Sequence, residues 1–383
     1  MNRHNKLLDR KILNERYDKI LMWVLILLIV FGLVMIYSAS VDGRIRKIDS
    51  EYYYIIRQGI FFFISIIFGL VNFATISMRK LQRLIPLIVF VSLFLLIFVL
   101  FVGTEVNGAK RWIRILGIFN IQPAELFKFV VILYLASYLH RKFEVLTEFK
   151  KIWFVGIVPA FGAALILVSG DLGSAVIVFV ITLSMLFMAG LRLSWFLIII
   201  VIGLIGAVFA ILIAPYRIER IMTFLHPEAD PLGAGFQTIQ SFVANANGGI
   251  WGVGLGNGMA RYGLPELHTD FIASFIVEEL GVVALIILCF TYIWITIRAF
   301  SIGKKASDLD LFYSSFVAKG IGVWIGIQAL LHIGINTGTL PTKGLTLPFV
   351  SYGGSSLLVG VLAISVLMRI DYENRRKTLG FDI

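Results

Sequence analysis

Long runs of apolar residues alternate with short polar segments along the whole chain. Three examples are ILMWVLILLIVFGLVMIY, FFFISIIFGLVNFA and SWFLIIIVIGLIGAVFAILIA. A helix needs about 20 mainly apolar residues to cross the hydrocarbon core of a bilayer, and each of these runs approaches that length. The pattern therefore predicts an all-α, polytopic membrane protein.

We expect ten transmembrane helices and a long outer loop between the seventh and the eighth. The first apolar run is longer than that of a secretory signal and follows a basic tail, so we interpret it as an anchor. The predicted domains are a cytoplasmic tail at 1–18, a membrane domain at 19–369 with its outer loop at 215–269, and a second cytoplasmic tail at 370–383. The predicted spans are 19–40, 55–76, 84–103, 123–140, 152–169, 172–190, 194–214, 270–298, 312–335 and 350–369.

Composition and charge agree with this topology. The chain is 59% hydrophobic and only 15% charged, whereas soluble domains carry about 25% charged residues. Most of the 34 Lys and Arg residues fall on the side of the membrane that holds both termini. Because cytoplasmic loops are enriched in these residues, both termini are predicted to be cytoplasmic. The net charge of +11 thus reports topology, and we expect no nucleic-acid binding.

Cysteine and histidine add little to the picture. The single cysteine, Cys289, lies inside the eighth predicted span, so an intrachain disulfide is impossible. The five histidines show no spacing typical of metal ligands, and a zinc site is not expected.

Ionisable residues gather at the outer ends of three spans. Such residues usually face a protein interior or a wet cavity. Glu125 and Lys128 lie three apart on one face of the fourth span, and Asp171 falls in the turn between the fifth and sixth spans. Asp270 falls at the outer start of the eighth span, where Thr269 is a plausible N-cap. Their common depth favours one polar site.

Each of these residues has a purely structural alternative. Glu125 and Lys128 could form only an intrahelical ion pair, and Asp171, which lies among glycines, could only shape a turn. Asp270 could be a surface cap, although an acid at a helix N-terminus stays ionised more easily and so suits a proton acceptor.

Two further carboxylates, Glu278 and Glu279, lie about 12–14 Å down the eighth span at 1.5 Å per residue. For these we favour a structural role over catalysis, as partners of Lys319 in the ninth span. The outer loop before them contains the glycine run GGIWGVGLGNG. Its spacing is not that of a phosphate-binding fingerprint, and it predicts a tight loop or re-entrant backbone.

A carboxylate at an outer membrane mouth beside basic residues has two natural uses. It could accept a proton from a sugar hydroxyl while Arg and Lys hold a pyrophosphate leaving group. It could instead serve ion- or proton-coupled transport, which favours a site near the midplane and matching repeats. We find no internal repeat, and the polar residues gather at one face. The residues therefore favour an outer active site for a lipid-linked substrate.

Five segments carry a resemblance to a known family: RWIRILGIFNIQPAELFK, GDLGSA, QSFVANANGGIWGVGLGNG, LPELHTDFIASFIVEELG and LPTKGLTLPFVSYGGSSLL. With them the chain resembles, along nearly its whole length, the SEDS family of bacterial shape, elongation, division and sporulation proteins. Several stretches look more like the division members than the elongation members, and a sporulation role stays open. Two departures from the usual pattern are Ala273–Ser274 and the pair Asn245 and Asn247.

The resemblance implies a ten-span fold and a peptidoglycan glycosyltransferase. Such an enzyme would polymerise lipid II at the outer face of the bacterial cytoplasmic membrane, at the division septum, and release undecaprenyl pyrophosphate. The essential aspartate of the family maps to Asp270, which we assign as general base toward the 4-hydroxyl of the acceptor sugar. By the same mapping, Glu125, Lys128 and Asp171 belong to the polar substrate site.

Other site residues rest on position and charge. Glu266, just before the acid, is a further candidate for substrate binding, and the candidates for phosphate contact are Arg111, Arg217, Arg220 and Lys343. No cofactor is demanded by the sequence, although a divalent cation such as Mg²⁺ or Mn²⁺ could neutralise the pyrophosphate.

The expected partners are a class B penicillin-binding protein with transpeptidase activity, other divisome proteins and membrane lipid. The rival functions are a lipid II flippase, an elongation-type glycan polymerase and a structural scaffold.

Overall fold

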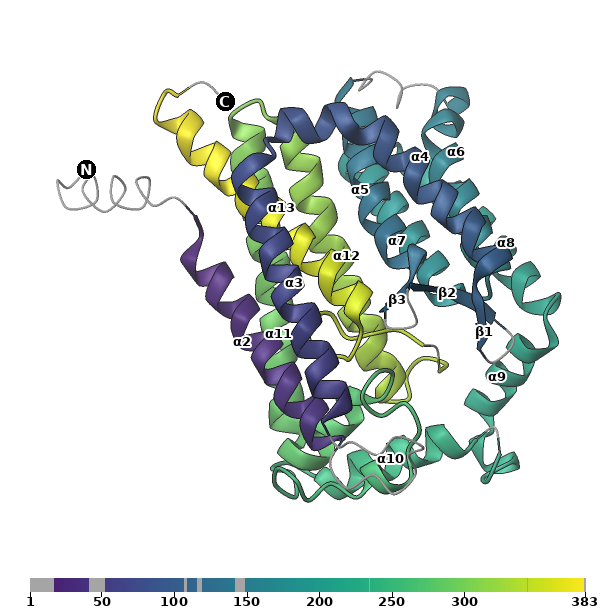
Figure 1. Cartoon of the computed structure of the whole chain (residues 1–383). Coiled ribbons are helices and arrows are strands. Elements are labelled where there is room, and N and C mark those ends of the chain that lie inside the picture. The colour runs from purple at the N-terminus through teal and green to yellow at the C-terminus, as the bar shows by residue number, and fades with distance from the viewer. Residues whose placement is uncertain are drawn as a thin grey trace.

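The computed structural model describes residues 17–40, 52–106, 109–115, 119–141, 149–233, 235–342 and 344–381. Its long helices run side by side as a bundle (Figure 1). These helices are α2 (Lys19–Ser38), α3 (Tyr53–Thr75), α4 (Met78–Val102), α5 (Pro123–Arg141), α6 (Phe149–Val168), α7 (Leu172–Met188), α8 (Leu193–Leu212), α11 (Ile272–Asp308), α12 (Phe312–Asn336) and α13 (Gly354–Thr378).

Each predicted span overlaps one of these helices. Among the described residues, eight helices are long and apolar enough to cross a membrane, and two shorter apolar helices span Trp153–Val168 and Leu172–Met188. The all-α membrane fold is therefore confirmed, while the count of ten crossings stays a prediction.

Polar side chains are buried inside the bundle and apolar side chains face outward, as expected for a protein in lipid. Helix α5 is almost completely buried, and its buried residues include Glu125 and Lys128. Helix α8 is among the most apolar of the set and has no buried residue. Since lipid tails are as apolar as leucine, an apolar helix can face them, while polar side chains must pair inside the protein. Polar chemistry is thus concentrated in the interior.

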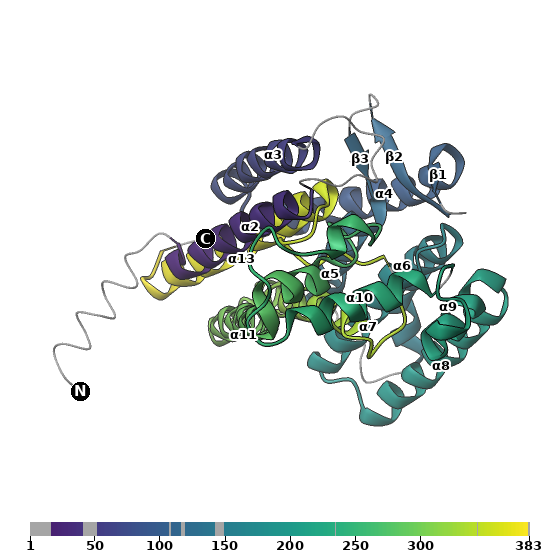
Figure 2. The same cartoon turned by 90° about the horizontal axis from the view of Figure 1, so that it is seen from below.

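Smaller elements lie in the lower half of Figure 1, with α10 lowest and the sheet higher up, and Figure 2 views the molecule from that side. A three-stranded antiparallel sheet follows α4, in the order β1 (Thr104–Val106), β2 (Ala109–Ile115) and β3 (Phe119–Ile121). Helices α9 (Pro215–Leu225) and α10 (Phe236–Gly248) lie within the predicted outer loop. The sequence predicted the outer loop that contains α9 and α10, but it predicted neither these two helices nor the sheet.

The start of α2 and the end of α13 lie at the opposite end of the bundle. Arg298, deep in α11, pairs with Asp18 before α2 at 2.5 Å, and Asn374 of α13 donates to the carbonyl of Ile302 at 3.1 Å. This agrees with an even number of crossings, and the cytoplasmic side stays a prediction. The N-terminal tail to residue 16 lies outside the described residues. Helix α13 continues through the predicted boundary at 370.

Helix α11 is broken at Gly281, where φ is 77°. The glycine-rich segment 249–260 fits against this break as a loop, as the glycine run predicted. Val253 and Gly254 donate backbone hydrogen bonds to the carbonyls of Glu278 and Glu279, both at 2.9 Å. A side chain at position 252 would meet the carbonyl oxygen of Glu279 at 2.2 Å. Only glycine allows this close approach.

The predicted pairing of Glu278 and Glu279 with Lys319 is wrong. Glu278 accepts hydrogen bonds from the backbone of Met259 and Ala260 at 3.1 and 3.0 Å. Glu279 accepts from the Ser38 hydroxyl at 2.7 Å and from the backbone of Gly256 at 2.9 Å. Lys319 packs against Gly303 instead, about 36 Å along α11 from Glu279 at 1.5 Å per residue. The carboxylates are structural, but their partners are backbone N–H groups of the glycine-rich loop.

The sequence suggested Thr269 as the N-cap of α11, but Thr269 does not cap this helix. The residue before the helix is Phe271, and its side chain makes no capping hydrogen bond. The Thr269 hydroxyl donates to the carbonyl and the carboxylate of Glu266 at 3.0 and 2.9 Å. Thr269 therefore stabilises the turn that precedes Asp270 rather than the helix.

Candidate active site

Asp270 lies in the turn between the glycine-rich loop and α11, at the end of the bundle that carries the sheet. Its backbone N–H donates to the carbonyl of Glu266 at 3.0 Å, and its side chain is partly buried. The carboxylate faces Gly344, where an added Cβ would lie 3.1 Å from Oδ2. No described residue donates a hydrogen bond to this carboxylate. It is therefore available to a ligand.

The surroundings of Asp270 raise its pKa to about 7 from the ordinary value of 3.8. Burial is the largest cause, because it disfavours the charged form, and the nearby charges of Glu266 and Asp171 raise the pKa further. The guanidinium groups of Arg111 and Arg220 act in the opposite sense. A carboxylate with a pKa near neutrality is well suited to general-base work.

A basic cleft adjoins Asp270 through Gly344. It encloses about 550 Å³ of unoccupied space, part of it open to the outside. Three arginines from two different elements face it, Arg111 from β2 and Arg217 and Arg220 from α9. The remaining lining residues are Gly170, Asp171, Leu172, Gly173, Ile211, Tyr216, Ile221, Pro341, Thr342 and Gly344.

The three arginines differ in how they are held. Arg217 donates to the carbonyls of Ala210 and Leu167 at 2.7 and 2.9 Å, so it ties α9 to α8 and α6. Arg111 donates to the carbonyl of Gly170, while its buried Nε has no partner among the described residues. Arg220 is exposed and donates to no described residue. Arg111 and Arg220 are therefore the guanidinium groups most available to an anion.

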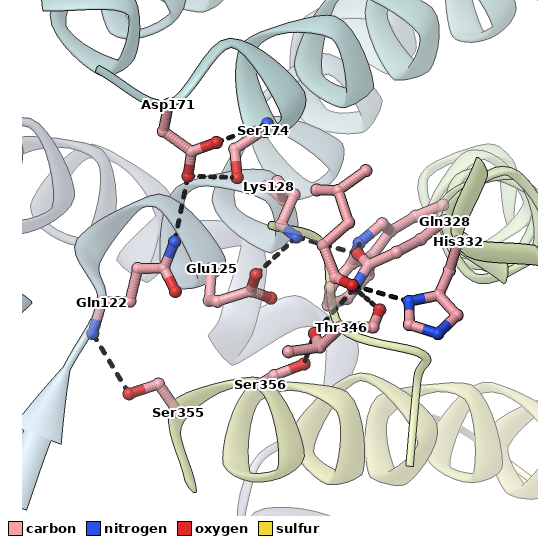
Figure 3. A network of polar contacts seen from close by, with 12 residues as sticks. Gln122, Glu125, Lys128, Asp171, Ser174, Gln328, His332, Thr346, Ser355 and Ser356 are labelled. Carbon is pink, nitrogen blue, oxygen red and sulfur yellow. Dashed lines mark hydrogen bonds and ion pairs between the residues drawn. The ribbon is translucent and has the colours of Figure 1, made fainter. Parts of the chain in front are cut away.

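Glu125 and Lys128 belong to a buried polar network (Figure 3) and are not among the residues that line the cleft. Lys128 is fully buried and donates to Glu125 and to Gln328, each at 2.8 Å. Gln328 in turn donates to the carbonyl of Thr346 at 3.0 Å. The intrahelical pair expected as the structural alternative is present, and it also joins α5 to α12 and to the segment 337–353.

Asp171 has both of the roles that the sequence left open. It caps α7, accepting from the backbone and the hydroxyl of Ser174 at 3.0 and 2.8 Å, and it lines the cleft. Gln122 donates to the same carboxylate at 3.0 Å, and the Gln122 backbone donates to Ser355 at 3.1 Å (Figure 3). The site thus links α5, α7 and α13.

Glu266 and Lys343 are the remaining two candidates for substrate binding. Glu266 lies next to Asp270 with a positive φ of 53° and is exposed, so its main effect is electrostatic. Lys343 lies outside the described residues, although its neighbours Thr342 and Gly344 line the cleft.

Sequence analysis missed the amide side chains that hold the site together. Gln122, Gln328 and Asn336 are buried and contact the groups described above. A signal was available for two of them, because Gln328 and Asn336 fall within or at the end of an apolar span, where a polar side chain must find a partner. Among the described residues, no group of three or more His, Cys, Asp or Glu side chains could hold a metal ion.

A family model described as "Cell cycle protein" and named for FtsW, RodA and SpoVE matches residues 18–376. A protein of Neisseria gonorrhoeae named "Probable peptidoglycan glycosyltransferase FtsW" is 43% identical over 418 aligned positions, which cover 99% of this chain and 90% of that protein. A protein of Escherichia coli O6:H1 with the same name is 42% identical, over 94% of this chain and 87% of that protein.

Two solved structures are similar over most of their length. One chain, from the structure titled "Structural coordination of polymerization and crosslinking by a peptidoglycan synthase complex", is 26% identical with a TM-score of 0.75 and covers 94% of this chain and 98% of its own. The rod shape determining protein RodA of Thermus thermophilus is 23% identical with a TM-score of 0.68, over 94% of this chain and 97% of its own. The second likeness concerns the fold alone.

Proposed function

Because the chain belongs to the FtsW, RodA and SpoVE family of cell cycle proteins, we propose that it is a peptidoglycan glycosyltransferase that polymerises lipid II at the outer face of the cytoplasmic membrane. Its relatives at about 40% identity carry the name FtsW, which favours septal over elongation-type synthesis. The apolar helices make it a multi-pass membrane protein. Placement at the division septum is part of the proposal.

The observation that carries the proposal is a carboxylate that accepts no hydrogen bond from a described residue and lies beside a basic cleft. Asp270 has a pKa of about 7, and the adjoining space is lined by Arg111 and Arg220. The cleft lies beside α8, the helix without buried residues, and α9, whose Tyr216 is exposed. A lipid-linked sugar would reach it from the membrane with its pyrophosphate toward the arginines.

In the proposed reaction, the Asp270 carboxylate accepts the proton of the acceptor sugar 4-hydroxyl as the oxygen attacks C1 of the donor sugar. The bond between C1 and the pyrophosphate oxygen breaks, and undecaprenyl pyrophosphate leaves with that electron pair. Arg111 and Arg220 stabilise the charge that develops on the phosphates, which is often the largest single contribution to catalysis. Arg217 acts mainly by fixing α9.

A divalent cation such as Mg²⁺ or Mn²⁺ remains a proposal of the sequence. The described residues provide no cluster of three ligands, so they do not form a metal site by themselves. The mechanism above contains no step through a cation.

We propose a transpeptidase of the class B penicillin-binding type as the partner. Support comes from the similar structure whose title describes a peptidoglycan synthase complex that coordinates polymerization and crosslinking. Other divisome proteins and lipid II itself belong to the same proposal.

The test is polymerisation of labelled lipid II by the purified protein with a cognate transpeptidase. Asp270→Asn should lower the rate by about 10²-fold or more, since it removes the general base. Glu219→Gln, an exposed α9 position, serves as the matched control. Wild-type protein that makes no glycan would overturn the proposal. Lipid II translocation in vesicles that survives Asp270→Asn would favour the flippase instead.

A further inference from the structure

The start of α11 is capped in an unusual way. The first N–H groups of a helix lack partners within it, and the side chain of the preceding residue commonly accepts one of them. Phe271 precedes α11 and cannot do so. Thr269 bonds to Glu266, and the carboxylate of Asp270 accepts no hydrogen bond from a described residue.

Asn336, the last residue of α12, supplies the cap from a different helix. Its Oδ1 accepts from the backbone N–H of Ser274, the third residue of α11, at 3.0 Å and from the Ser274 hydroxyl at 3.0 Å. Its Nδ2 donates to the backbone carbonyls of Asp270 and His332, both at 2.9 Å. The side chain is 1% exposed. Both donors and both acceptor positions of the amide are therefore used.

Two neighbours of Asn336 complete the arrangement. The hydroxyl of Ser274 and the side chain of Asn245 both donate to the Asn336 carbonyl, at 3.2 and 2.8 Å. The arrangement joins the end of α12 to α10 and to the start of α11.

This cap has a consequence for Asp270. Aspartate is among the best helix-capping residues, and a carboxylate that accepts backbone N–H groups has a lowered pKa. A carboxylate used in this way is a weaker base and is already bonded. Since Asn336 occupies the N–H of Ser274, the Asp270 side chain is left for a ligand. The bond to the Asp270 carbonyl fixes the backbone from which that side chain projects.

The same face of α12 also holds the two residues that follow Gly344. His332 bonds to the carbonyl of Leu345 at 2.6 Å, and Gln328 donates to that of Thr346 at 3.0 Å. Gly344, which faces Asp270, immediately precedes them. Helix α12 therefore holds the backbone at Asp270 and also the backbone of the two residues that follow Gly344, the residue that the Asp270 carboxylate faces.

We infer that Asn336 is a positioning residue for the proposed polymerisation. Its amide oxygen caps α11 from α12, so that the Asp270 carboxylate stays free, and its amide N–H holds the Asp270 carbonyl, so that this carboxylate is placed to accept the proton of the acceptor sugar. The inference rests on the proposed function and adds to it a residue that acts only through Asp270.

The decisive variant is Asn336→Ala. It leaves the N–H of Ser274 open to the Asp270 carboxylate, which should then cap the helix. We expect kcat to fall about 10- to 100-fold with little change in KM for lipid II, because the base is lost rather than a substrate contact. The acid limb of the pH–rate profile should move down by about one pH unit or more. The charged groups around Asp270, namely Glu266, Asp171, Arg111 and Arg220, are unchanged.

Two further variants separate this role from folding. Asn336→Asp keeps an acceptor for Ser274 and loses the donor to Asp270, so kcat should fall while the acid limb stays at or above that of the wild type. Thr337→Ala removes a hydroxyl on the next residue that bonds to Ile333 and Gly334, and it should behave as wild type. If Asn336→Ala does not fold, wild-type kcat in Asn336→Asp overturns the inference.

A readout without substrate distinguishes the inference from the proposed function. The pH dependence of carbodiimide labelling of Asp270, followed by mass spectrometry, should have a midpoint near the pKa of about 7 and a lower one in Asn336→Ala. Equal midpoints in the two proteins would overturn the positioning role even if polymerisation is observed. A lower midpoint in a protein that makes no glycan would retain the positioning role and reject the polymerase.

Discussion

At the scale of single residues, two carboxylates differ in their hydrogen bonding: Asp171, which lines the cleft, and Asp270, which lies beside it. Asp171 accepts three hydrogen bonds, from Gln122 and from the backbone and hydroxyl of Ser174, and it is committed to holding helices together. Asp270 accepts none from the described residues. Burial and its acidic neighbours raise its pKa. The absence of bonds, rather than the residue type, distinguishes the proposed base from the structural acid.

Asp270→Asn should stabilise the folded protein at neutral and alkaline pH. The folded-state pKa is raised to about 7 from 3.8, so the native state binds the proton more tightly than the unfolded chain. Wild-type stability is therefore full below pH 4, declines as pH rises toward 7, and is then constant. Asparagine carries no such cost, and we expect a gain of about 1–3 kcal/mol at pH 8.

Thermal unfolding in detergent at pH 4.5 and pH 8 measures this effect. The difference between Asp270→Asn and wild type should grow with pH. A difference that is the same at both values would show that the carboxylate is not strained by its surroundings.

At the scale of elements, the broken helix α11 and the glycine-rich loop behave as one unit. The loop donates backbone hydrogen bonds to the carboxylates of Glu278 and Glu279 and to the carbonyls at the break. Ser38 of α2 adds a bond to Glu279. This unit carries several exposed apolar side chains, including Trp251. Two acids inside an apolar segment are tolerated because backbone N–H groups satisfy them.

Glu279→Ala should loosen this unit. It leaves the N–H of Gly256 and the buried Ser38 hydroxyl without their acceptor, which we expect to cost about 1–3 kcal/mol. Hydrogen exchange of peptides covering 249–260 should accelerate, while α5 should stay protected. Glu219→Ala, at an exposed position of α9, is the control. Unchanged exchange in the loop of Glu279→Ala would contradict the structural role.

At the scale of the whole molecule, polar groups lie in the interior and toward one end of the bundle, and apolar side chains lie on the outside. The interior contains the Lys128 network, while α8 presents only apolar surface. Figure 1 shows the sheet and α9 on the same side of the bundle, and residues of β2 and α9 line the basic cleft. Such an arrangement suits the proposed function, in which a lipid-borne substrate reaches a charged site from the membrane.

Single cysteines test the predicted orientation. In a Cys289→Ser background, Asp230→Cys lies near the end of the bundle that carries the cleft. It should react with a membrane-impermeant maleimide in spheroplasts, whose cytoplasmic membrane is intact. Lys304→Cys, at the opposite end of α11, should react only after lysis. Both positions are exposed. The reverse pattern would place Asp270 at the cytoplasmic face, where the proposed polymerisation could not occur.

The sequence by itself determined the membrane class and the positions of the long apolar helices, and it singled out Asp270 as the candidate acid. Runs of apolar residues specify a span locally, since the bilayer imposes both length and helical structure. The loop character of the glycine run followed from its own residues in the same way. The family resemblance directed attention to Asp270, although nothing in the residues indicated that its carboxylate would accept no hydrogen bond from the described part of the chain.

Only the tertiary structure decided which polar groups meet. Ser38 and Glu279 are 241 residues apart, Gln122 and Ser355 are 233 apart, and Asn336 reaches back 66 residues to Asp270. Helix packing sets these distances, and an apolar run does not encode which of its few polar members will face another helix. That is why Glu279 was assigned the wrong partner and Thr269 the wrong role. For the same reason, the cap that leaves Asp270 free became visible only in the folded chain.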